Sequence, residues 1–217
     1  MRAIALIFFI LLGLCLQGRA EARDLQQAVF AGGCFWCVES DYESVDGVIE
    51  AVSGYTGGKL KNPTYKQVSR GGTGHFEAVQ VTFDADVVSY RQLVDLFWRM
   101  VDPTDPNGQF CDRGDSYRTA VFPLTPAQAE AAKVSRAEAA RALGRNIVTP
   151  ILGASKFHPA EAYHQDYYKQ TKRVLTRYGY ISKAKAYKRY RKGCGRDKRL
   201  RALWGGEAFT VSHGHGS

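Results

Sequence analysis

The chain has 217 residues, 45% hydrophobic and 24% charged, which is enough for one compact domain with a core and too apolar for a disordered chain. Its 22 Gly and 7 Pro follow no three-residue period and no longer repeat is present, which excludes collagen-like and solenoid architectures. The formal charge of +9 is uneven: residues 165–204 hold 14 Lys or Arg and two Asp, a net +12, which leaves −3 for the rest. We interpret this basic segment as a solvated face and expect no nucleic-acid partner, because no zinc-finger, helix-turn-helix or RNA-binding signature accompanies it.

The N-terminus predicts a cleaved secretory signal peptide over residues 1–20. Arg2 supplies a positive start, Ala3 to Leu16 form an apolar run of 14 residues, and small residues follow three and one before the expected cut. A membrane helix needs about 20 apolar residues, so we expect no stable membrane insertion after the leader is removed. The mature chain is expected to begin near Glu21 with a linker over 21–27, and to be periplasmic or secreted.

The first half of the mature chain alternates between the periodicities of strands and helices. Alternating apolar residues predict strands, and apolar residues at helical spacing predict helices, one of them with Ser89 as its N-cap. The strands are expected at 28–31, 48–55, 76–83 and 117–122, and the helices at 35–45 and 89–101. This β-α-β-β-α-β order is typical of a ferredoxin-like core, so we predict an α/β (α+β) two-layer sandwich.

Extra elements are expected after that core. Pro126 favours the first turn of an Ala-rich helix that ends near Gly144. Residues 146–152 predict a further strand, and Pro159 predicts the start of another helix.

The basic segment predicts an irregular C-terminal wrap from about residue 170. Its tyrosines, Leu200 and Trp204 are typical of a chain that packs onto a domain. We therefore place the folded domain at 28–204 and a flexible tail at 205–217.

Four cysteines remain once Cys15 leaves with the leader: Cys34, Cys37, Cys111 and Cys194. In an oxidising compartment an even number is consistent with two structural disulfides, although a domain of this size does not need such staples. Only one close pair is present, which does not complete a tetrahedral metal site, so we expect neither a metal nor another cofactor.

Cys34 lies where Gly32 and Gly33 end a strand and a helix begins. A thiol at a helix N-terminus meets the positive end of the helix dipole, which favours the thiolate. We therefore interpret Cys34 as a reactive thiol rather than a small core residue. Cys37 follows three positions later, so the two cysteines are also a candidate redox pair.

Glu77 is the second residue that suggests chemistry. The period of two places it on one strand face with Val79, Val81 and Phe83. A carboxyl at the edge of that apolar face would be desolvated, would hold its proton nearer neutral pH, and could donate it to a substrate oxygen. The alternative is a strand-end Glu in solvent, which alternation alone does not exclude.

Seven groups of residues form a specific set in chain order. They are Gly32-Gly33-Cys34-Phe35-Trp36, Ser53-Gly54-Tyr55-Thr56-Gly57-Gly58, Asn62-Pro63-Thr64-Tyr65, Gly74-His75-Phe76-Glu77-Ala78-Val79, Asp112-Arg113-Gly114-Asp115-Ser116-Tyr117-Arg118, Ala160-Glu161 with His164-Gln165, and Gly193-Cys194-Gly195. The set closely resembles the MsrA family of peptide methionine sulfoxide reductases, and the resemblance runs from about Ala28 to Trp204.

The resemblance implies reduction of methionine (S)-sulfoxide, free and in oxidised proteins, back to methionine. Cys34 would attack the sulfoxide sulfur and become a sulfenic acid while Glu77 protonates the oxygen. Cys194 would then form a disulfide with Cys34, and thioredoxin or a thioredoxin-like domain would reduce that disulfide.

The resemblance also implies a substrate pocket. The hydroxyls of Tyr65 and Tyr117 would hydrogen-bond the sulfoxide oxygen, and Phe35 and Trp36 would hold the methyl group of the substrate. Asp112 would lie at the same site. We expect the protein to act as a monomer.

Two positions depart from the family pattern or lack a role in it. Position 37 is Cys where many members have Gly, so Cys37 competes with Cys194 to resolve Cys34. We favour Cys194, because its glycine neighbours let the backbone bend and its basic neighbours favour a thiolate. Cys111 is expected to be a third free thiol.

Two other functions are considered. A thioredoxin-like oxidoreductase would use Cys34 with Cys37, reduce protein disulfides and leave Cys194 dispensable. A secreted basic binding protein held by two disulfides would have no reactive thiol and would bind anionic surfaces in a salt-sensitive way. The Glu77 motif and the Phe35-Trp36 pair favour the sulfoxide reductase.

Overall fold

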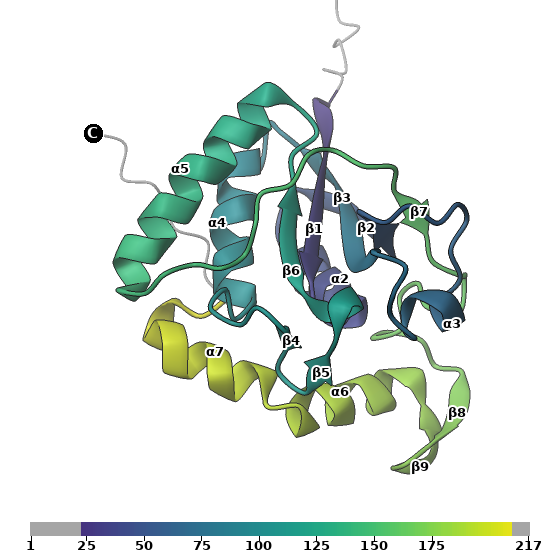
Figure 1. Ribbon diagram of the computed structural model, residues 1–217. Coiled ribbons are helices and arrows are strands. Elements are labelled where there is room, and N and C mark those ends of the chain that lie inside the picture. Colours follow the sequence, from purple (N-terminus) through teal and green to yellow (C-terminus); the bar gives the residue numbers. More distant parts are fainter. Residues whose placement is uncertain (1–22, 210–217) are drawn as a thin grey trace, which may run out of the picture.

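The computed structural model describes residues 23–209, so the predicted leader lies outside the described part (Figure 1). Within this range, none of the helices combines the length and apolar character needed to cross a bilayer.

A five-stranded sheet forms the centre of the molecule, and its strand pairs are antiparallel (Figure 1). In spatial order the strands are β6 (Thr119–Phe122), β1 (Leu25–Gly32), β3 (Phe76–Asp84), β2 (Val48–Thr56) and β7 (His158–Pro159). Counted by sequence, the four longer strands lie in the order fourth, first, third, second, with helices between them as in a ferredoxin-like core. The predicted fold class is confirmed, and β1 begins three residues earlier than expected, inside the predicted linker.

Helices cover one face of this sheet, and a loop covers the other. They are α2 (Phe35–Glu43) and α4 (Tyr90–Met100), with α5 (Pro126–Leu143) packed on α4 and a single turn, α3 (Tyr65–Val68), before β3. The core between sheet and helices includes Phe30, Val81, Tyr42 and Phe97, all with no exposed area. On the opposite face, Phe76 and Phe122 pack beneath Phe157 of the loop before β7. Successive side chains along a strand point to opposite faces of the sheet, so apolar residues on both faces are buried by the layers that cover them.

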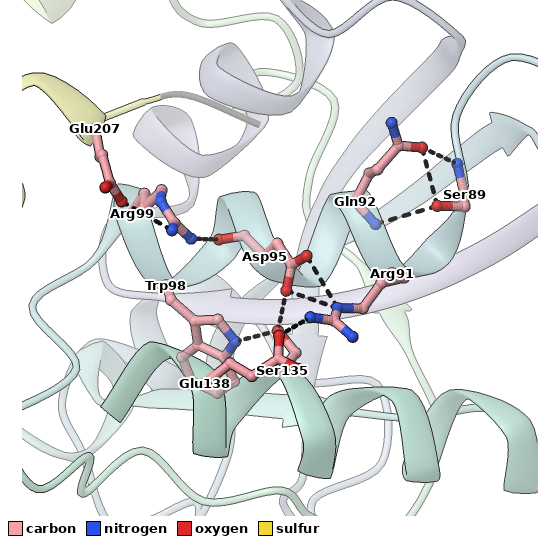
Figure 2. Close-up of polar contacts among 9 residues, drawn as sticks. All are labelled: Ser89, Arg91, Gln92, Asp95, Trp98, Arg99, Ser135, Glu138 and Glu207. Atoms are coloured by element: carbon pink, nitrogen blue, oxygen red, sulfur yellow. Dashed lines mark hydrogen bonds and ion pairs between the residues drawn. The ribbon is translucent and has the colours of Figure 1, made fainter. Parts of the chain in front are cut away.

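The helix α4 is fixed to α5 by a polar network (Figure 2). It begins in a capping box, in which Ser89 Oγ accepts from Gln92 N at 3.2 Å and Gln92 Oε1 accepts from Ser89 N at 2.9 Å. Further along, the buried carboxylate of Asp95 accepts from Arg91 Nε at 2.9 Å and from Ser135 Oγ of α5. Trp98 Nε1 donates to the same Ser135 Oγ at 2.8 Å. The network therefore joins the two helices through hydrogen bonds to Ser135 and an ion pair between Arg91 and Glu138.

Two of the extra elements predicted after the core are wrong. Residues 146–152 form no strand; a single bridge joins Ile151 to Val121, because the segment crosses the sheet as a covering loop. Pro159 ends the short strand β7 rather than starting a helix, and the residues after it form turns. Gln165 in these turns contacts the sheet, since its Oε1 accepts from the backbone N–H of Ser53 at 2.9 Å. Asp166 has a φ of 55°, which a helix does not allow.

The C-terminal wrap is regular, contrary to the irregular chain expected. It consists of a hairpin of β8 (Arg173–Thr176) and β9 (Gly179–Ser182), then α6 (Lys183–Gly193) and α7 (Arg196–Trp204). Figure 1 shows α6 and α7 running one after the other past one end of the sheet, with the hairpin projecting beyond α6. Leu200 and Trp204 are buried, so the prediction that this segment packs onto the domain is confirmed.

Candidate functional site

The turn between β1 and α2 places Cys34 at the N-cap of α2. Gly33 before it has a φ of +82°, and a Cβ built there would lie 2.5 Å from Cβ of Gln109. Only glycine fits both the backbone conformation and the close approach, so the turn that presents Cys34 depends on it. Cys34 is half-buried and Cys37, one turn into α2, is buried; both are free thiols.

A cavity of about 640 Å³ opens beside this turn. It brings together all eight side chains proposed for the site from the sequence: Cys34, Phe35, Trp36, Tyr65, Glu77, Asp112, Tyr117 and Cys194. They come from α2, α3, β3, the short strand β5 (Asp112–Arg113), the 3-10 turn η2 (Asp115–Tyr117) and the junction of α6 with α7. Side chains from six separate segments therefore converge on one space, as a preorganised site requires.

Glu77 lies at the base of the cavity and is 1% exposed. Its carboxyl accepts the backbone N–H of Phe35 at 3.1 Å. Burial raises the pKa of Glu77 to about 8, and the charge of Asp112 adds to the rise, while hydrogen bonds from Phe35 and Tyr117 oppose it. The expected inward orientation is confirmed and the solvent-exposed alternative is wrong. At neutral pH this carboxyl holds a proton that it can donate.

The two thiols of α2 influence each other, and their pKa values are shifted in opposite directions. The pKa of Cys34 is raised well above its usual value by the hydrogen bond with Cys37, by burial, and by the nearby charges of Cys37, Glu77 and Asp112. The pKa of Cys37 is lowered to about 7 by that hydrogen bond, then by the charges of Arg196 and Arg191, against the opposing effect of burial. The expectation that the helix start favours a Cys34 thiolate is therefore wrong for this state. The first free N–H of α2, that of Phe35, donates to Glu77 instead of the thiol.

Arg191 and Arg196, the basic neighbours expected to favour a thiolate at Cys194, act instead on Cys37. Arg196 is 2% exposed and donates to the backbone oxygens of Met100 at 2.9 Å and Gly32 at 3.2 Å. Arg191 donates to Asp41 at 2.7 Å, and both arginines line the cavity. Their fixed positive charges favour a thiolate at Cys37.

The hydroxyls of Tyr65 and Tyr117 lie close enough to interact with each other. Burial raises the pKa of Tyr65 to about 12, and the nearby charge of Glu77 adds to the rise. Burial also raises the pKa of Tyr117. Both hydroxyls therefore keep their protons at neutral pH, and the two O–H groups meet on the same side of the cavity as Glu77.

An aromatic wall faces these polar groups. Trp36 stacks on Tyr167 with ring centroids 3.8 Å apart, and Phe35 lies 6.2 Å from Trp36. His164 packs against Tyr65 at 4.4 Å, and burial lowers its pKa to about 4, so the imidazole is neutral. Tyr167 and His164 were missed as site residues, although the His164-Gln165 motif pointed to this segment.

Cys194 lies between α6 and α7 and is disulfide-bonded to Cys111, with Cα atoms 4.9 Å apart across a sequence separation of 83. Gly195 has a φ of +71°, so the predicted backbone bend beside Cys194 is confirmed. The prediction that Cys111 is a free thiol is wrong, because the helix junction brings Cys194 against the loop that carries Cys111. All four cysteines of the described chain line the same cavity.

Two groups of three potential metal ligands occur among residues 23–209. Cys111 and Cys194 with Asp112 form one group, but its sulfurs are joined to each other. Glu39, Glu43 and Asp166 form the other, and Lys169 already pairs with two of its carboxylates at 2.8 Å.

The arrangement at the cavity is suited to thiol chemistry: a nucleophilic sulfur, a protonated carboxyl beside it, two phenolic donors and a second cysteine pair.

Comparison with known proteins gives one consistent result. The family model described as peptide methionine sulfoxide reductase matches residues 26–196. A "Peptide methionine sulfoxide reductase MsrA 2" of Rhizobium meliloti is 50% identical over 97% of this chain and 100% of its own length. The protein of the same name from Caulobacter vibrioides is 52% identical over 85% of this chain and 88% of its own.

Solved structures agree with the sequence relatives. Reduced Mxr1 from Saccharomyces cerevisiae is 30% identical with a TM-score of 0.64, covering 76% of this chain and 95% of its own. Methionine sulfoxide reductase A of Corynebacterium diphtheriae is 30% identical with a TM-score of 0.60, covering 68% and 75%.

Proposed function

The chain belongs to the peptide methionine sulfoxide reductase family and is an oxidoreductase that reduces methionine sulfoxide; we propose that it does so in the cavity around Cys34. The observation that carries this assignment of the site is the convergence of all eight side chains on one cavity, with Glu77 protonated at its base. We propose the (S) epimer of the sulfoxide, free or in oxidised proteins, as substrate.

In the first step the sulfur of Cys34 attacks the sulfoxide sulfur. Cys34 gives its proton to the Cys37 thiolate as the bond forms, because the two thiols are hydrogen-bonded and Cys37 is the more acidic. Glu77 donates its proton to the sulfoxide oxygen, and the hydroxyls of Tyr65 and Tyr117 stabilise that oxygen. The hydroxyl then moves from the methionine sulfur to the Cys34 sulfur as the bond between the two sulfurs breaks, which releases methionine and leaves Cys34 as a sulfenic acid.

The methyl group of the substrate packs against Phe35 and Trp36. This wall is apolar and is backed by Tyr167, so it accepts a methyl group while the oxygen turns toward the hydroxyls. The fixed positions of wall and donors around the sulfur are the physical basis for choosing one epimer. Asp112 also lines the cavity, and its charge adds to the rise in the pKa of Glu77 that burial causes.

In the second step a cysteine attacks the sulfenic acid and water leaves, which forms a disulfide. We assign this role to Cys194, as the resemblance implies. Cys111 then attacks the Cys194 sulfur of the Cys34–Cys194 bond, which returns Cys34 as a thiol and yields the Cys111–Cys194 disulfide. The pairing of Cys111 with Cys194 in the structure supports this order.

In the third step a thioredoxin-like dithiol reduces Cys111–Cys194 and becomes a disulfide itself, which balances the two electrons transferred to methionine. We further propose that the chain is exported on its N-terminal leader and acts as a monomer in the periplasm or outside the cell. Its electron donor must then face that oxidising compartment. A fusion of the leader to a reporter that is active only after export tests the location.

The thioredoxin-like alternative is not favoured, because a carboxyl and two phenols around Cys34 suit an oxygen-bearing substrate rather than a disulfide. The test is an assay of the purified chain with both sulfoxide epimers and dithiothreitol, beside a protein-disulfide substrate such as insulin. We expect methionine from the (S) epimer alone and no catalysed reduction of insulin. Turnover of insulin without turnover of either epimer would reverse the assignment.

A further inference from the structure

The β8–β9 hairpin forms part of the rim of the cavity. Residues 174–177 line the same space as Cys34 and Glu77. The hairpin is a separate two-stranded sheet, and among the described residues neither of its strands pairs with a third. Figure 1 shows it projecting from the end of the molecule at which α6 begins. The backbone of the outer edges is therefore not paired with another strand, and of its carbonyls that of Tyr180 accepts from Arg173 at 2.6 Å.

The outer face of the hairpin exposes apolar side chains beside that open edge. Leu175 is 84% exposed and Tyr180 is 60% exposed, and the two are direct cross-strand partners. Cross-strand partners project from the same face of a sheet, so they form one apolar patch. A patch of this kind next to a catalytic cavity favours contact with a polypeptide.

The hairpin is also positively charged. The Arg173 guanidinium lies 4.9 Å from the centroid of Tyr180, and that of Arg177 lies 5.0 Å from Tyr178 and 5.1 Å from Tyr190. Neither guanidinium is ion-paired with a carboxylate of residues 23–209. The rings hold both arginines in place, and Arg173 also donates to the backbone oxygen of Tyr180 at 2.6 Å. The charge of Arg177 opposes the rise in the pKa of Asp112 that burial causes, so a positive field reaches the rim of the cavity.

We propose that this hairpin is the docking surface for the polypeptide that carries the sulfoxide, and that Arg173 and Arg177 make it favour sulfoxides flanked by Asp or Glu. The proposal rests on the proposed function, since it concerns the substrate of the same cavity. A methionine sulfoxide within a chain can reach Cys34 only if its neighbours cross the rim. The hairpin then offers backbone hydrogen bonds, an apolar contact at Leu175 and two fixed positive charges to those neighbours.

The test uses three peptides of equal length with one central sulfoxide flanked by Glu, Gln or Lys, with dithiothreitol as reductant. The measured quantity is the ratio of kcat/KM for the Glu-flanked peptide to that for the Lys-flanked peptide. We expect a ratio of about ten at low salt that falls toward one at high salt. In the double variant Arg173→Gln/Arg177→Gln the ratio should drop to about two. A general loss of catalysis in the variant lowers kcat/KM for both peptides equally and so leaves this ratio unchanged.

Arg145→Gln is the matched control, since it removes one exposed positive charge just after α5 and should leave the ratio unchanged. Leu175→Ser should lower kcat/KM about threefold for all three peptides and not for free methionine sulfoxide. A wild-type ratio near one, or an unchanged ratio in the double variant, would overturn the proposal. A double variant with a normal ratio but a raised KM for thioredoxin would make the hairpin the reductant's site instead. Failure to reduce free methionine sulfoxide would count against the proposed function, not against the hairpin.

Discussion

The α4–α5 interface and the cavity around Cys34 both bury charged side chains, but in opposite surroundings. At the interface, the carboxylate of Asp95 meets Arg91 and the hydroxyl of Ser135, so its charge is matched (Figure 2). In the cavity, burial disfavours the charge of Glu77, and the nearby charges of Asp112 and Cys37 add to this effect. Matched charges stabilise a fold, whereas gathered acids keep protons and reactivity available at neutral pH.

Within the described residues, buried polar atoms without a partner occur on α4, at Tyr90 and Arg99, and also beside the cavity. Both ring nitrogens of His164 and Nε1 of Trp36 are buried next to the cavity without a hydrogen-bond partner in the described chain. Nε1 of Trp98, at the interface, donates to Ser135 at 2.8 Å. Buried donors without partners cost free energy of folding, so the site is expected to lower stability and the interface to raise it.

The largest effect is expected from Cys34→Ser. A serine hydroxyl at its ordinary pKa cannot replace the sulfur nucleophile, so reduction of methionine sulfoxide should be abolished. Stability should change little, since Cys34 is half-buried and bonds only within the cysteine pair. Turnover with dithiothreitol and thermal unfolding measure the two quantities. Substantial remaining turnover would refute Cys34 as the nucleophile.

Glu77→Gln should reduce the single-turnover rate by about 10²–10⁴-fold, the range of general acid catalysis. Because the pKa of Glu77 is about 8, the wild-type rate should fall as the pH rises through that value and the proton is lost. The variant has no such proton, so this alkaline fall should disappear. Glu50→Gln, an exposed change on the neighbouring strand β2, is the control.

The same variant tests the cost of the site to stability. The pKa of Glu77 is raised in the folded state from 4.5 to about 8, so folding favours its protonated form. Wild-type stability is therefore lost as the pH rises between these two values, and the loss is complete above the higher one. Gln stays neutral, so the variant should be more stable than the wild type at pH 9. Urea unfolding at pH 6 and pH 9 measures this. A variant that is less stable at both pH values would mean that Glu77 supports the fold as Asp95 does.

Cys194→Ser should allow one methionine per enzyme molecule but reduce thioredoxin-dependent turnover about 10–100-fold, because the path through the Cys111–Cys194 disulfide is lost. Peptide mapping without reduction, after one equivalent of sulfoxide, identifies the bond formed. We expect Cys34–Cys194 as the early link in the wild type. A Cys34–Cys37 link that forms equally fast in the variant, with undiminished turnover, would assign resolution to Cys37.

The sequence predicted the parts of the molecule in which periodicity is strong. Alternation gave β3 almost to the residue, and helical spacing with Ser89 as N-cap gave α4. Five of the seven motifs supplied all eight site residues.

Local patterns could not predict the features that depend on distant contacts. The helices α6 and α7 are basic on most sides, with few buried residues such as Ala186 and Leu200, so their apolar period is too sparse to read. The partner of Cys194 lies 83 residues away, and the acidity of Cys37 depends on arginines more than 150 positions later. These arrangements exist only after the C-terminal helices pack against α2.

The smallest effect on activity is expected from Ser135→Ala, which breaks the interface and spares the cavity. The change removes the acceptor of Trp98 and one donor to Asp95, both buried between α4 and α5. It should lower the free energy of unfolding by about 1–3 kcal/mol, the usual cost of leaving buried polar groups unpaired. The kcat/KM for methionine sulfoxide should stay within about twofold, because no residue of this network lines the cavity. Ser155→Ala, at an exposed serine, controls for loss of a hydroxyl alone. If Ser135→Ala lowered kcat/KM as strongly as it lowered stability, the two regions would be coupled rather than independent.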